Sequence, residues 1–287
     1  MNAEASSLLI LIPAYNEEAR IEPVLREYAA YFREHYGTRY SIVVVLNGCV
    51  DHTQQVVERV AADFPQLSFL NFPGRIGKGG ALIEGLKLFP LADLIGFVDA
   101  DGATPPRAFH DLVRRCAEVD CAIGSRWMDG ARIHQVQTGV RRLVSRGGNA
   151  IVQGLFWMGI HDTQCGAKVM RRAAVERIHP NLGVTDMAFD INLLYALKRE
   201  GFSIAEVPTE WTDKLGSTLT RGLVRASLSA LLSVVRLRLV YSPFYAWLRP
   251  LRPLETWIYR QLSSPAPLPV AAPRRPHAGP ESGSRPA

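Results

Sequence analysis

The sequence predicts an α/β fold in which a mostly parallel, Rossmann-like sheet is flanked by helices. Short apolar runs bounded by turn-forming residues alternate with helix-length patterns, and this alternation is typical of βαβ units. Several of the runs end directly in polar motifs, the place where open sheets of this kind bind ligands. With 287 residues, 47% hydrophobic and 21% charged, the chain can bury a full-sized core. We therefore expect one large domain with appendages.

Each expected element follows from the period of its apolar residues. The expected strands are Leu8–Ile12, Ile42–Leu46, Leu67–Leu70 and Leu94–Val98. The expected helices are Ile21–His35, Thr53–Asp63, Gly79–Phe89 and Pro106–Cys116, with Thr53 and Thr104 as caps. Further along, we expect helices at Val140–Met158 and Phe189–Arg199, with a loop at Asp162–Gly166 between them. The stretch from 126 to 211 is less regular than the part before it.

Polar segments follow the expected strands at four points, namely Asn16–Glu17, Asn47–Asp51, Arg75–Lys78 and Asp99–Asp101. The carboxyl ends of parallel strands meet at one edge of a sheet, so we expect these segments to converge on one crevice.

Asp99 and Asp101 follow an apolar run and are one residue apart. Two close carboxylates repel unless a cation or hydrogen-bond donors compensate them. Hard oxygen ligands suit Mg²⁺ or Mn²⁺, which bind through one or two carboxylates while substrate phosphates complete the coordination. An isolated Asp-x-Asp pair is also found in solvated turns, and convergence with the other segments favours the metal interpretation.

The charge balance predicts an anionic partner. The formal net charge is +6, which fits nucleic acid, a phospholipid surface or a phosphorylated substrate. Nucleic acid is disfavoured because the basic tail beyond Ser263 lacks the interleaved aromatic residues of a stacking surface. Cysteines and histidines show no metal-ligand spacing, and we expect the histidines to be solvated or capping; the residues are Cys49, Cys116, Cys121, Cys165, His110, His134 and His161. With no signal peptide in the sequence, we expect a reducing, cytoplasmic setting.

Near the C-terminus, Leu223–Val240 carries apolar residues at helical spacing. The apolar stripe is Val224, Leu228, Leu231, Leu232, Val235 and Leu239, with Ser227, Ser229 and Ser233 on the other face. Its uninterrupted apolar core, 226–235, is far shorter than the roughly 20 residues that cross a bilayer. Residues 216–262 are therefore expected to be amphipathic helices lying on the cytoplasmic face of an anionic membrane, a peripheral association that basic residues around the stripe favour. Alternatively, the stripe packs on the domain's own core. Residues 263–287 are expected to be disordered.

A set of motifs gives the chain a family resemblance. They are Ile12–Glu17 (IPAYNE), Asn47–Thr53 (NGCVDHT), Gly77–Ala81 (GKGGA), Asp99–Gly102 (DADG), Gly124–Arg126 (GSR), Asp162–Lys168 (DTQCGAK), Phe189–Tyr195 and Glu206–Thr212. In order and spacing, the first four resemble the inverting family 2 glycosyltransferases of GT-A fold. The later ones look like the dolichyl-phosphate β-glucosyltransferases, and the related polyprenyl-phosphate sugar synthases share fewer of them. The resemblance implies a GT-A domain over 1–215, with a donor half at about 8–125 and an acceptor half at about 126–215.

The resemblance implies transfer of a sugar, glucose from UDP-glucose, to the phosphate of a polyprenol. A metal at Asp101, with Asp99 nearby, would neutralise the departing diphosphate. The implied donor-binding residues are Pro13, Tyr15, Glu17, Asn47, Lys78 and Asp99. Asn47 departs from the acidic pattern common in the family, so whether the nucleotide donor carries uracil or guanine stays open. Thr104 stands where mannosyl-transferring relatives carry Gln and favours glucose.

An acceptor phosphate is already anionic and needs cations to hold it more than a general base. Arg126 matches a position that faces the acceptor phosphate in relatives, and Arg141 or Arg142 would complete the clamp. Asp162 and Asp190 are candidates for holding sugar hydroxyls or orienting the acceptor. A list of the catalytic candidates thus contains Asp101, Arg126 and Asp162. Cys165 and Trp211 are expected to be packing residues, although Trp211 could also stack on sugar or lipid.

Two rival functions stay open. A family 2 transferase with a soluble hydroxyl acceptor would need a carboxylate base such as Asp162 or Asp190 and no lipid. A nucleotide-sugar-binding protein without turnover would keep the donor pocket alone, and the presence of both acids of the pair and of basic acceptor positions counts against it.

Overall fold

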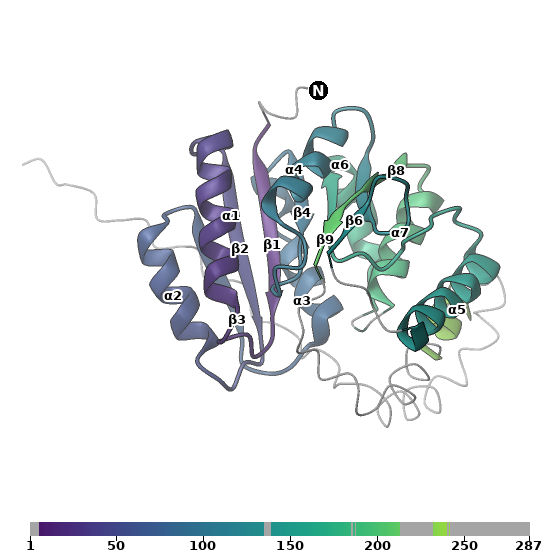
Figure 1. The fold of residues 1–287 in the computed structure, drawn as a ribbon, viewed down its shortest axis with the longest axis horizontal. Coiled ribbons are helices and arrows are strands. Elements are labelled where there is room, and N and C mark those ends of the chain that lie inside the picture. The colour runs from purple at the N-terminus through teal and green to yellow at the C-terminus, as the bar shows by residue number, and fades with distance from the viewer. Residues whose placement is uncertain are drawn as a thin grey trace, which may run out of the picture.

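The computed structural model describes residues 6–134, 139–184, 186, 188–212, 232–239 and 241, and for residues 139–146 it describes the helix without side chains. The expected amphipathic stretch at 216–231, its continuation beyond 241 and the expected disordered tail lie outside the described residues. Figure 1 shows the described part as a sheet with helices packed along it.

A central sheet organises the described residues, with the strand order β3-β2-β1-β4-β7-β5-β8. Its strands are β1 (Leu8–Ala14), β2 (Tyr40–Asn47), β3 (Leu67–Phe72), β4 (Leu94–Phe97), β5 (Cys121–Ser125), β7 (Lys168–Arg171) and β8 (Ile204–Pro208). Strand β7 runs antiparallel to its neighbours β4 and β5, and the other pairs are parallel. A second, two-stranded sheet pairs β6 (Arg132–Ile133) with β9 (Glu210–Trp211). The expectation of a mostly parallel α/β sheet is confirmed.

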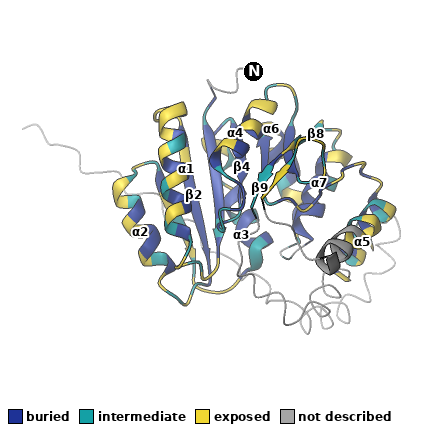
Figure 2. Ribbon diagram, viewed as in Figure 1, coloured by how far each residue is buried: buried dark blue, intermediate teal, exposed yellow. Residues whose placement is uncertain are grey.

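The helices cover both faces of this sheet. They are α1 (Ile21–Tyr36), α2 (Thr53–Asp63), α3 (Gly77–Leu86), α4 (Pro106–Arg115), α5 (Gly139–Phe156), α6 (Arg172–Ile178) and α7 (Phe189–Arg199), with 3₁₀ turns η2 (Phe89–Leu91) and η3 (His179–Asn181). The expected helices and strands exist within a few residues of their expected bounds. Figure 2 shows buried strands between helices whose outer faces are exposed.

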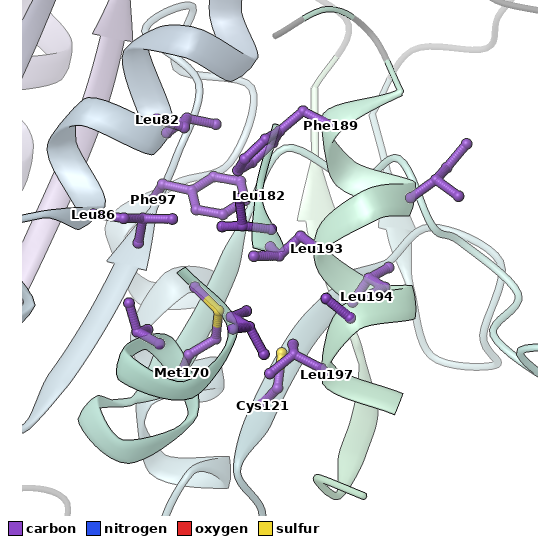
Figure 3. Packing of buried hydrophobic residues seen from close by; sticks show 14 of the residues in the cluster. Leu82, Leu86, Phe97, Cys121, Met170, Leu182, Phe189, Leu193, Leu194 and Leu197 are labelled. Carbon is purple, nitrogen blue, oxygen red and sulfur yellow. The ribbon is translucent and has the colours of Figure 1, made fainter. Parts of the chain in front are cut away.

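Alternate residues of each buried strand face different helices. In β1, Ile10 packs with α1, α2 and α4, whereas Leu9 and Leu11 pack with α3 and the acceptor-half helices. Both faces are covered, which is why the strands are near-continuous apolar runs. Figure 3 shows part of the hydrophobic cluster that contains Leu9 and Leu11, in which Phe97 of β4 lies close to Leu82 of α3 and to Phe189 of α7.

Both expected caps are wrong. Thr53 is the first residue of α2, and its hydroxyl accepts a hydrogen bond from Glu17 N–H at 2.8 Å while donating to Asp51. Thr104 is buried ahead of α4, which begins after Pro105. The hydroxyl of Thr53 holds the loop after β1 and does not cap its own helix. Sequence patterns for helix starts describe neighbouring residues only, so they do not predict this long-range contact.

Residues 232–239 form a helix whose buried face is not the expected apolar stripe. Val234, Leu237 and Ser233 are buried, and the first two join the cluster that contains α5 and α7. The stripe residues Leu232, Val235 and Leu239 are among the exposed large hydrophobics. The helix therefore packs on the domain's own core, as the alternative expected, but it does so through Val234 and Leu237, and the stripe residues in this segment face outward. Among the residues described, we find no helix with the length and apolar character to cross a bilayer.

Candidate active site

The acid pair lies just beyond the carboxyl end of β4, in the middle of the sheet. Asp99 Oδ1 forms an ion pair with Lys78 Nζ at 2.5 Å. Asp101 Oδ1 accepts a hydrogen bond from Ala103 N–H at 2.9 Å. Burial raises the pKa of the Asp101 carboxyl; the Ala103 N–H opposes this rise and the charge of Asp99 adds to it. The two carboxylates therefore repel each other electrostatically, as expected for a pair that binds a cation.

Lys78 enters this site from the first turn of α3. Burial works to lower the pKa of Lys78, but the negative charges of Asp99 and Asp190 raise it above its ordinary value. The side chain is an ammonium ion at neutral pH. A lysine and the unpaired N–H groups of a helix N-terminus make this corner suited to phosphate.

The end of β2 packs against the turn that precedes α3. Asn47 is buried, and its Oδ1 accepts a hydrogen bond from Ile76 N–H at 2.7 Å. Gly48 has a φ of +67°, and a Cβ there would lie 2.6 Å from Arg75 N. Only a glycine fits this turn. Asn47 is expected to bind the nucleotide-sugar donor. In the structure, its side-chain carbonyl oxygen holds the loop that carries Arg75 and Lys78.

Two residues of the IPAYNE motif, the aromatic Tyr15 and the acidic Glu17, lie at the same end of the sheet. The ring of Tyr15 lies under the Arg75 guanidinium, whose carbon is 4.5 Å from the ring centroid. The Glu17 carboxylate pairs with Arg20 through two hydrogen bonds. Pro13 is the next-to-last residue of β1, in register with Val45 of β2. The sequence pattern gave Arg75 no individual role, although it lies in one of the segments expected to converge.

In the expected acceptor half, Arg126 and Asp162 form a closely matched pair. Asp162 Oδ2 accepts hydrogen bonds from Arg126 Nε at 2.7 Å and from its backbone N–H at 3.1 Å, and Oδ1 accepts from Nη2 at 2.9 Å. Burial works to lower the pKa of Arg126, but the hydrogen bonds and charge of Asp162 raise it above its ordinary value. The guanidinium carbon also lies 5.3 Å from the ring centroid of Trp211. Arg126 is therefore held in one orientation by a carboxylate and an aromatic ring.

The two halves meet at Gly166. A Cβ at this position would lie 2.1 Å from Asp99 Oδ2, closer than any real contact. The loop that carries Asp162 therefore rests directly on the acid pair. The charge of Asp99 also acts on Arg126. Residues from β4, α3, the β5 end and the 162–166 loop are brought to one place.

Other candidates prove to be buried supports. Asp190 of α7 accepts a hydrogen bond from Lys168 Nζ at 2.6 Å, and Lys168 also donates to the Cys165 carbonyl at 2.7 Å. Cys165 is buried, which raises the pKa of its thiol to about 11 and fits the expected packing role. Lys168 is a further site-supporting residue that sequence reasoning missed; its place at the end of the DTQCGAK motif was the available signal.

The histidine expectation is partly wrong. His110 is buried among aromatic rings, and its Nδ1 lies 3.1 Å from the Tyr31 hydroxyl. It packs on α1 because α4 presents this face to the core. His134 and His161 are exposed, as expected. Arg141 and Arg142, expected in the phosphate clamp, lie in the first part of α5, where the structure describes the helix without side chains.

The donor set fits a divalent cation that is also held by substrate. No group of three or more His, Cys, Asp or Glu side chains that would hold a metal occurs in the described part of the chain. Two mutually repelling carboxylates, one partly balanced by a lysine, match the one or two protein ligands that Mg²⁺ uses beside phosphates.

The fold is that of the GT-A glycosyltransferases. Glucosyl-3-phosphoglycerate synthase from Mycobacterium tuberculosis in complex with UDP is similar with a TM-score of 0.61, 20% identity and coverage of 82% of both chains. The mannosyltransferase PcManGT from Pyrobaculum calidifontis in complex with GDP-Man and Mn²⁺ gives a TM-score of 0.57 at 16% identity, over 88% of this chain and 69% of that one.

Sequence comparison identifies the family. Residues 9–179, more than half of the chain, match Glycosyl transferase family 2, and the chain belongs to this family. It is 34% identical over 213 residues to dolichyl-phosphate beta-glucosyltransferase ALG5C of Trichomonas vaginalis, covering 71% of this chain and 63% of that protein. It is 29% identical over 251 residues to dolichyl-phosphate beta-glucosyltransferase of Saccharomyces cerevisiae, covering 80% and 74%. The chain thus spans somewhat under two thirds of the first relative.

Proposed function

We propose that this chain transfers glucose from UDP-glucose to a polyprenyl, dolichyl-type phosphate with inversion at the anomeric carbon. The observation that carries the proposal is the contact at Gly166, which brings the acid pair beside the Arg126–Asp162 pair. A diphosphate donor needs the acids and Lys78, and a phosphate acceptor needs a fixed guanidinium. The similarity to relatives named dolichyl-phosphate beta-glucosyltransferase supports this choice of donor and acceptor.

In the proposed reaction, the acceptor phosphate oxygen attacks the anomeric carbon and the bond from that carbon to the diphosphate breaks. The products are UDP and polyprenyl phosphate β-glucose. A divalent metal held by Asp99 and Asp101 would supply positive charge for the leaving diphosphate. Lys78 would donate hydrogen bonds to the same phosphates, and Tyr15 with Arg75 would border the nucleoside.

On the acceptor side, the proposal needs no general base. The phosphate is ionised at neutral pH, and Arg126 would hold it by charge-assisted hydrogen bonds, with Arg141 or Arg142 as the expected partners. The rival with a soluble hydroxyl acceptor needs a free carboxylate. Asp162 accepts three hydrogen bonds from Arg126, and Asp190 is paired with Lys168. Neither carboxylate is disposed as a base, which supports a phosphate acceptor.

We also propose that the chain binds an anionic membrane surface from the cytoplasmic side as a peripheral protein. The support is the outward apolar face of the 232–239 helix, Leu232, Val235 and Leu239, together with Trp157, a residue 82% exposed that directly follows α5. The two helices are in contact, because Arg238 Nε donates to the Leu155 carbonyl at 2.9 Å. Exposed apolar groups next to basic residues are typical of interfacial helices.

The experiment is a transfer assay with radiolabelled UDP-glucose, a polyprenyl phosphate and Mg²⁺ or Mn²⁺. GDP-mannose and the other nucleotide sugars test the donor, and soluble alcohols test the acceptor. We expect label in the lipid fraction from UDP-glucose alone. Label on a soluble alcohol would support the rival transferase. UDP binding without transfer to any acceptor would support the binding protein without turnover.

A further inference from the structure

A carboxylate of strand β8 has no role in the reaction proposed above, yet it is well bonded beside the site. Glu206 has a side chain only 10% exposed. Its Oε1 accepts a hydrogen bond from Asp162 N–H at 3.0 Å. Its Oε2 accepts from His161 N–H at 2.9 Å and lies 2.8 Å from His161 Nδ1. One side chain thus fastens two consecutive residues of the loop that precedes Gly166.

The loop bonded to Glu206 is the one that fixes Arg126. Asp162 N–H is bonded to Glu206, and the Asp162 carboxylate is bonded to both the backbone and the guanidinium of Arg126. Strand β8 is therefore linked to Arg126 through two carboxylates: that of Glu206 holds the Asp162 backbone, and that of Asp162 holds Arg126. Strands β5 and β8 are paired in parallel register, with Ile123 opposite Glu206 and Ser125 opposite Pro208, so Arg126, directly after β5, lies next to the strand that carries Glu206.

Other attachments of this loop come from α5 and from two lysines, Lys168 of β7, which donates to the Cys165 carbonyl, and Lys198 of α7, which donates to the Met158 carbonyl. Asn149 Nδ2 donates to the His161 carbonyl at 2.8 Å, and Gln153 Oε1 accepts from Gly159 N–H at 3.1 Å. These bonds hold residues 159–161 to a helix outside the main sheet, whereas Glu206 holds the loop to the sheet. A hydrogen bond to a charged acceptor is also the stronger kind. The Asp162 backbone is thus tied to strand β8 by a hydrogen bond to a charged acceptor, Glu206.

We propose that Glu206 is a positioning residue for the acceptor phosphate. It fixes His161 and Asp162 so that Asp162 holds the Arg126 guanidinium in one orientation. This inference rests on the proposed function for its acceptor, but its structural part needs no substrate. Glu206 touches neither donor nor acceptor and acts through Asp162.

The test is Glu206→Gln, with Glu200→Gln as the matched control. An amide in place of the carboxylate turns an NH₂ group toward one of two N–H donors, so at least one of these bonds is lost. Glu200, directly after α7, accepts a hydrogen bond from Arg177 Nε of α6 at 2.6 Å, not from the loop. We expect Glu206→Gln to raise the KM for polyprenyl phosphate about tenfold, with the KM for the donor within about twofold. Glu200→Gln should change neither.

A double-mutant cycle with Asp162→Asn separates positioning from general stability. If Glu206 acts through Asp162, Glu206→Gln should add less than about twofold to the acceptor KM once Asp162→Asn is present. Equal effects in both backgrounds would overturn the proposal, as would equal rises in donor and acceptor KM.

Amide hydrogen exchange tests the structural part with no substrate at all. In Glu206→Gln, we expect faster exchange at the amides of 161, 162 and also 126, because the Arg126 N–H depends on Asp162. Faster exchange at 161 and 162 alone would overturn the proposal. A wild-type chain that transfers nothing to the lipid refutes the proposed function, while this measurement still decides whether Glu206 positions Arg126.

Discussion

The proposed donor half, residues 8–125, and the proposed acceptor half, residues 126–215, supply the same site in different ways. In the donor half, each contributing segment follows its own strand, and strand, turn and motif are continuous in sequence, as at β4 and Asp99 or β2 and Asn47. In the acceptor half, Arg126 follows β5 but is fixed by Asp162, 36 residues later, which is itself fixed by Glu206, a further 44 residues on. In the donor half, each residue is placed by the end of its own strand, and single contacts such as that of Asn47 with Ile76 join the segments, whereas Arg126 is held through two distant carboxylates in turn. Substitutions in the two halves should therefore fail in different ways.

The largest effect is expected in the donor half, for Asp101→Asn. Removing a charge from the pair weakens the electrostatic stabilisation of the leaving diphosphate, and transfer should fall at least about a thousandfold. Burial and Asp99 already raise the pKa of Asp101, so a neutral group costs the fold little. Transfer rate and the thermal midpoint are the measurements. An active variant would remove Asp101 from the chemistry, and a large drop in midpoint would make the loss structural.

Gly166→Ala tests the point where the halves meet. Its Cβ would displace the Asp99 carboxylate, which lies at the end of a short side chain, and so break the pair with Lys78. We expect kcat/KM to fall about a hundredfold, since small misplacements at a reacting site are costly. Gly154→Ala is the control, because a Cβ there meets nothing within 4 Å. Normal transfer by Gly166→Ala would show that the contact at Asp99 is dispensable.

Arg126→Ala should separate acceptor from donor. Loss of the guanidinium should raise the KM for polyprenyl phosphate by about tenfold to a hundredfold, because charge-assisted hydrogen bonds are lost. UDP affinity, measured by calorimetry with Mn²⁺ present, should stay within about twofold. The reverse pattern, weak UDP binding with a normal acceptor KM, would contradict the assignment of Arg126 to the acceptor half.

The membrane face should respond to charge without affecting the chemistry. A Val235→Asp, Leu239→Asp double variant should reduce pelleting with vesicles of anionic phospholipid several-fold, because two exposed apolar contacts are replaced by acids. Transfer to a short-chain acceptor in detergent should be unchanged. Leu91→Asp is the control, an exposed leucine in the donor half. Equal loss of pelleting in the control would attribute the effect to net charge alone.

The smallest effect is expected for Asp93, which lies just before β4 and connects Ser7 with Arg172. It accepts hydrogen bonds from Ser7 N–H at 3.0 Å and Ser7 Oγ at 2.8 Å, and pairs with Arg172 of α6. The Ser7 hydrogen bonds, with Arg172, lower the pKa of Asp93. A carboxyl with a lowered folded-state pKa stabilises the protein above its unfolded-state pKa of about 3.9 and loses this contribution as pH falls through the folded value.

Asp93→Asn should therefore lower the thermal midpoint by about 1–3 °C at pH 7, a small effect because the pair is partly exposed. The difference from wild type should shrink at about pH 3. Asp129→Asn, an exposed carboxylate in the acceptor half, is the control for the change of charge. A difference that stays constant with pH would contradict the role of the ionised form.

The sequence alone predicted the sheet, the order of its first elements and the family, because a 3.6-residue or two-residue period and a strand-end motif are local properties. It also placed Asp99, Lys78 and Arg126 among the site residues. It misplaced Thr53 and Thr104 as caps and His110 as solvated, because each of these is decided by a partner far along the chain, or by the face on which a helix packs.

Tertiary structure alone decided how the residues are joined. That Asn47 holds Ile76, that Gly166 rests on Asp99, and that Glu206 holds Asp162 against Arg126 are contacts across 29 to 67 positions of the sequence. Such contacts carry no period, because chain folding, not spacing, brings the groups together. The outward face of the 232–239 helix is of the same kind. The pattern marked an apolar stripe, and only packing on α5 and α7 determined that the stripe lies outside.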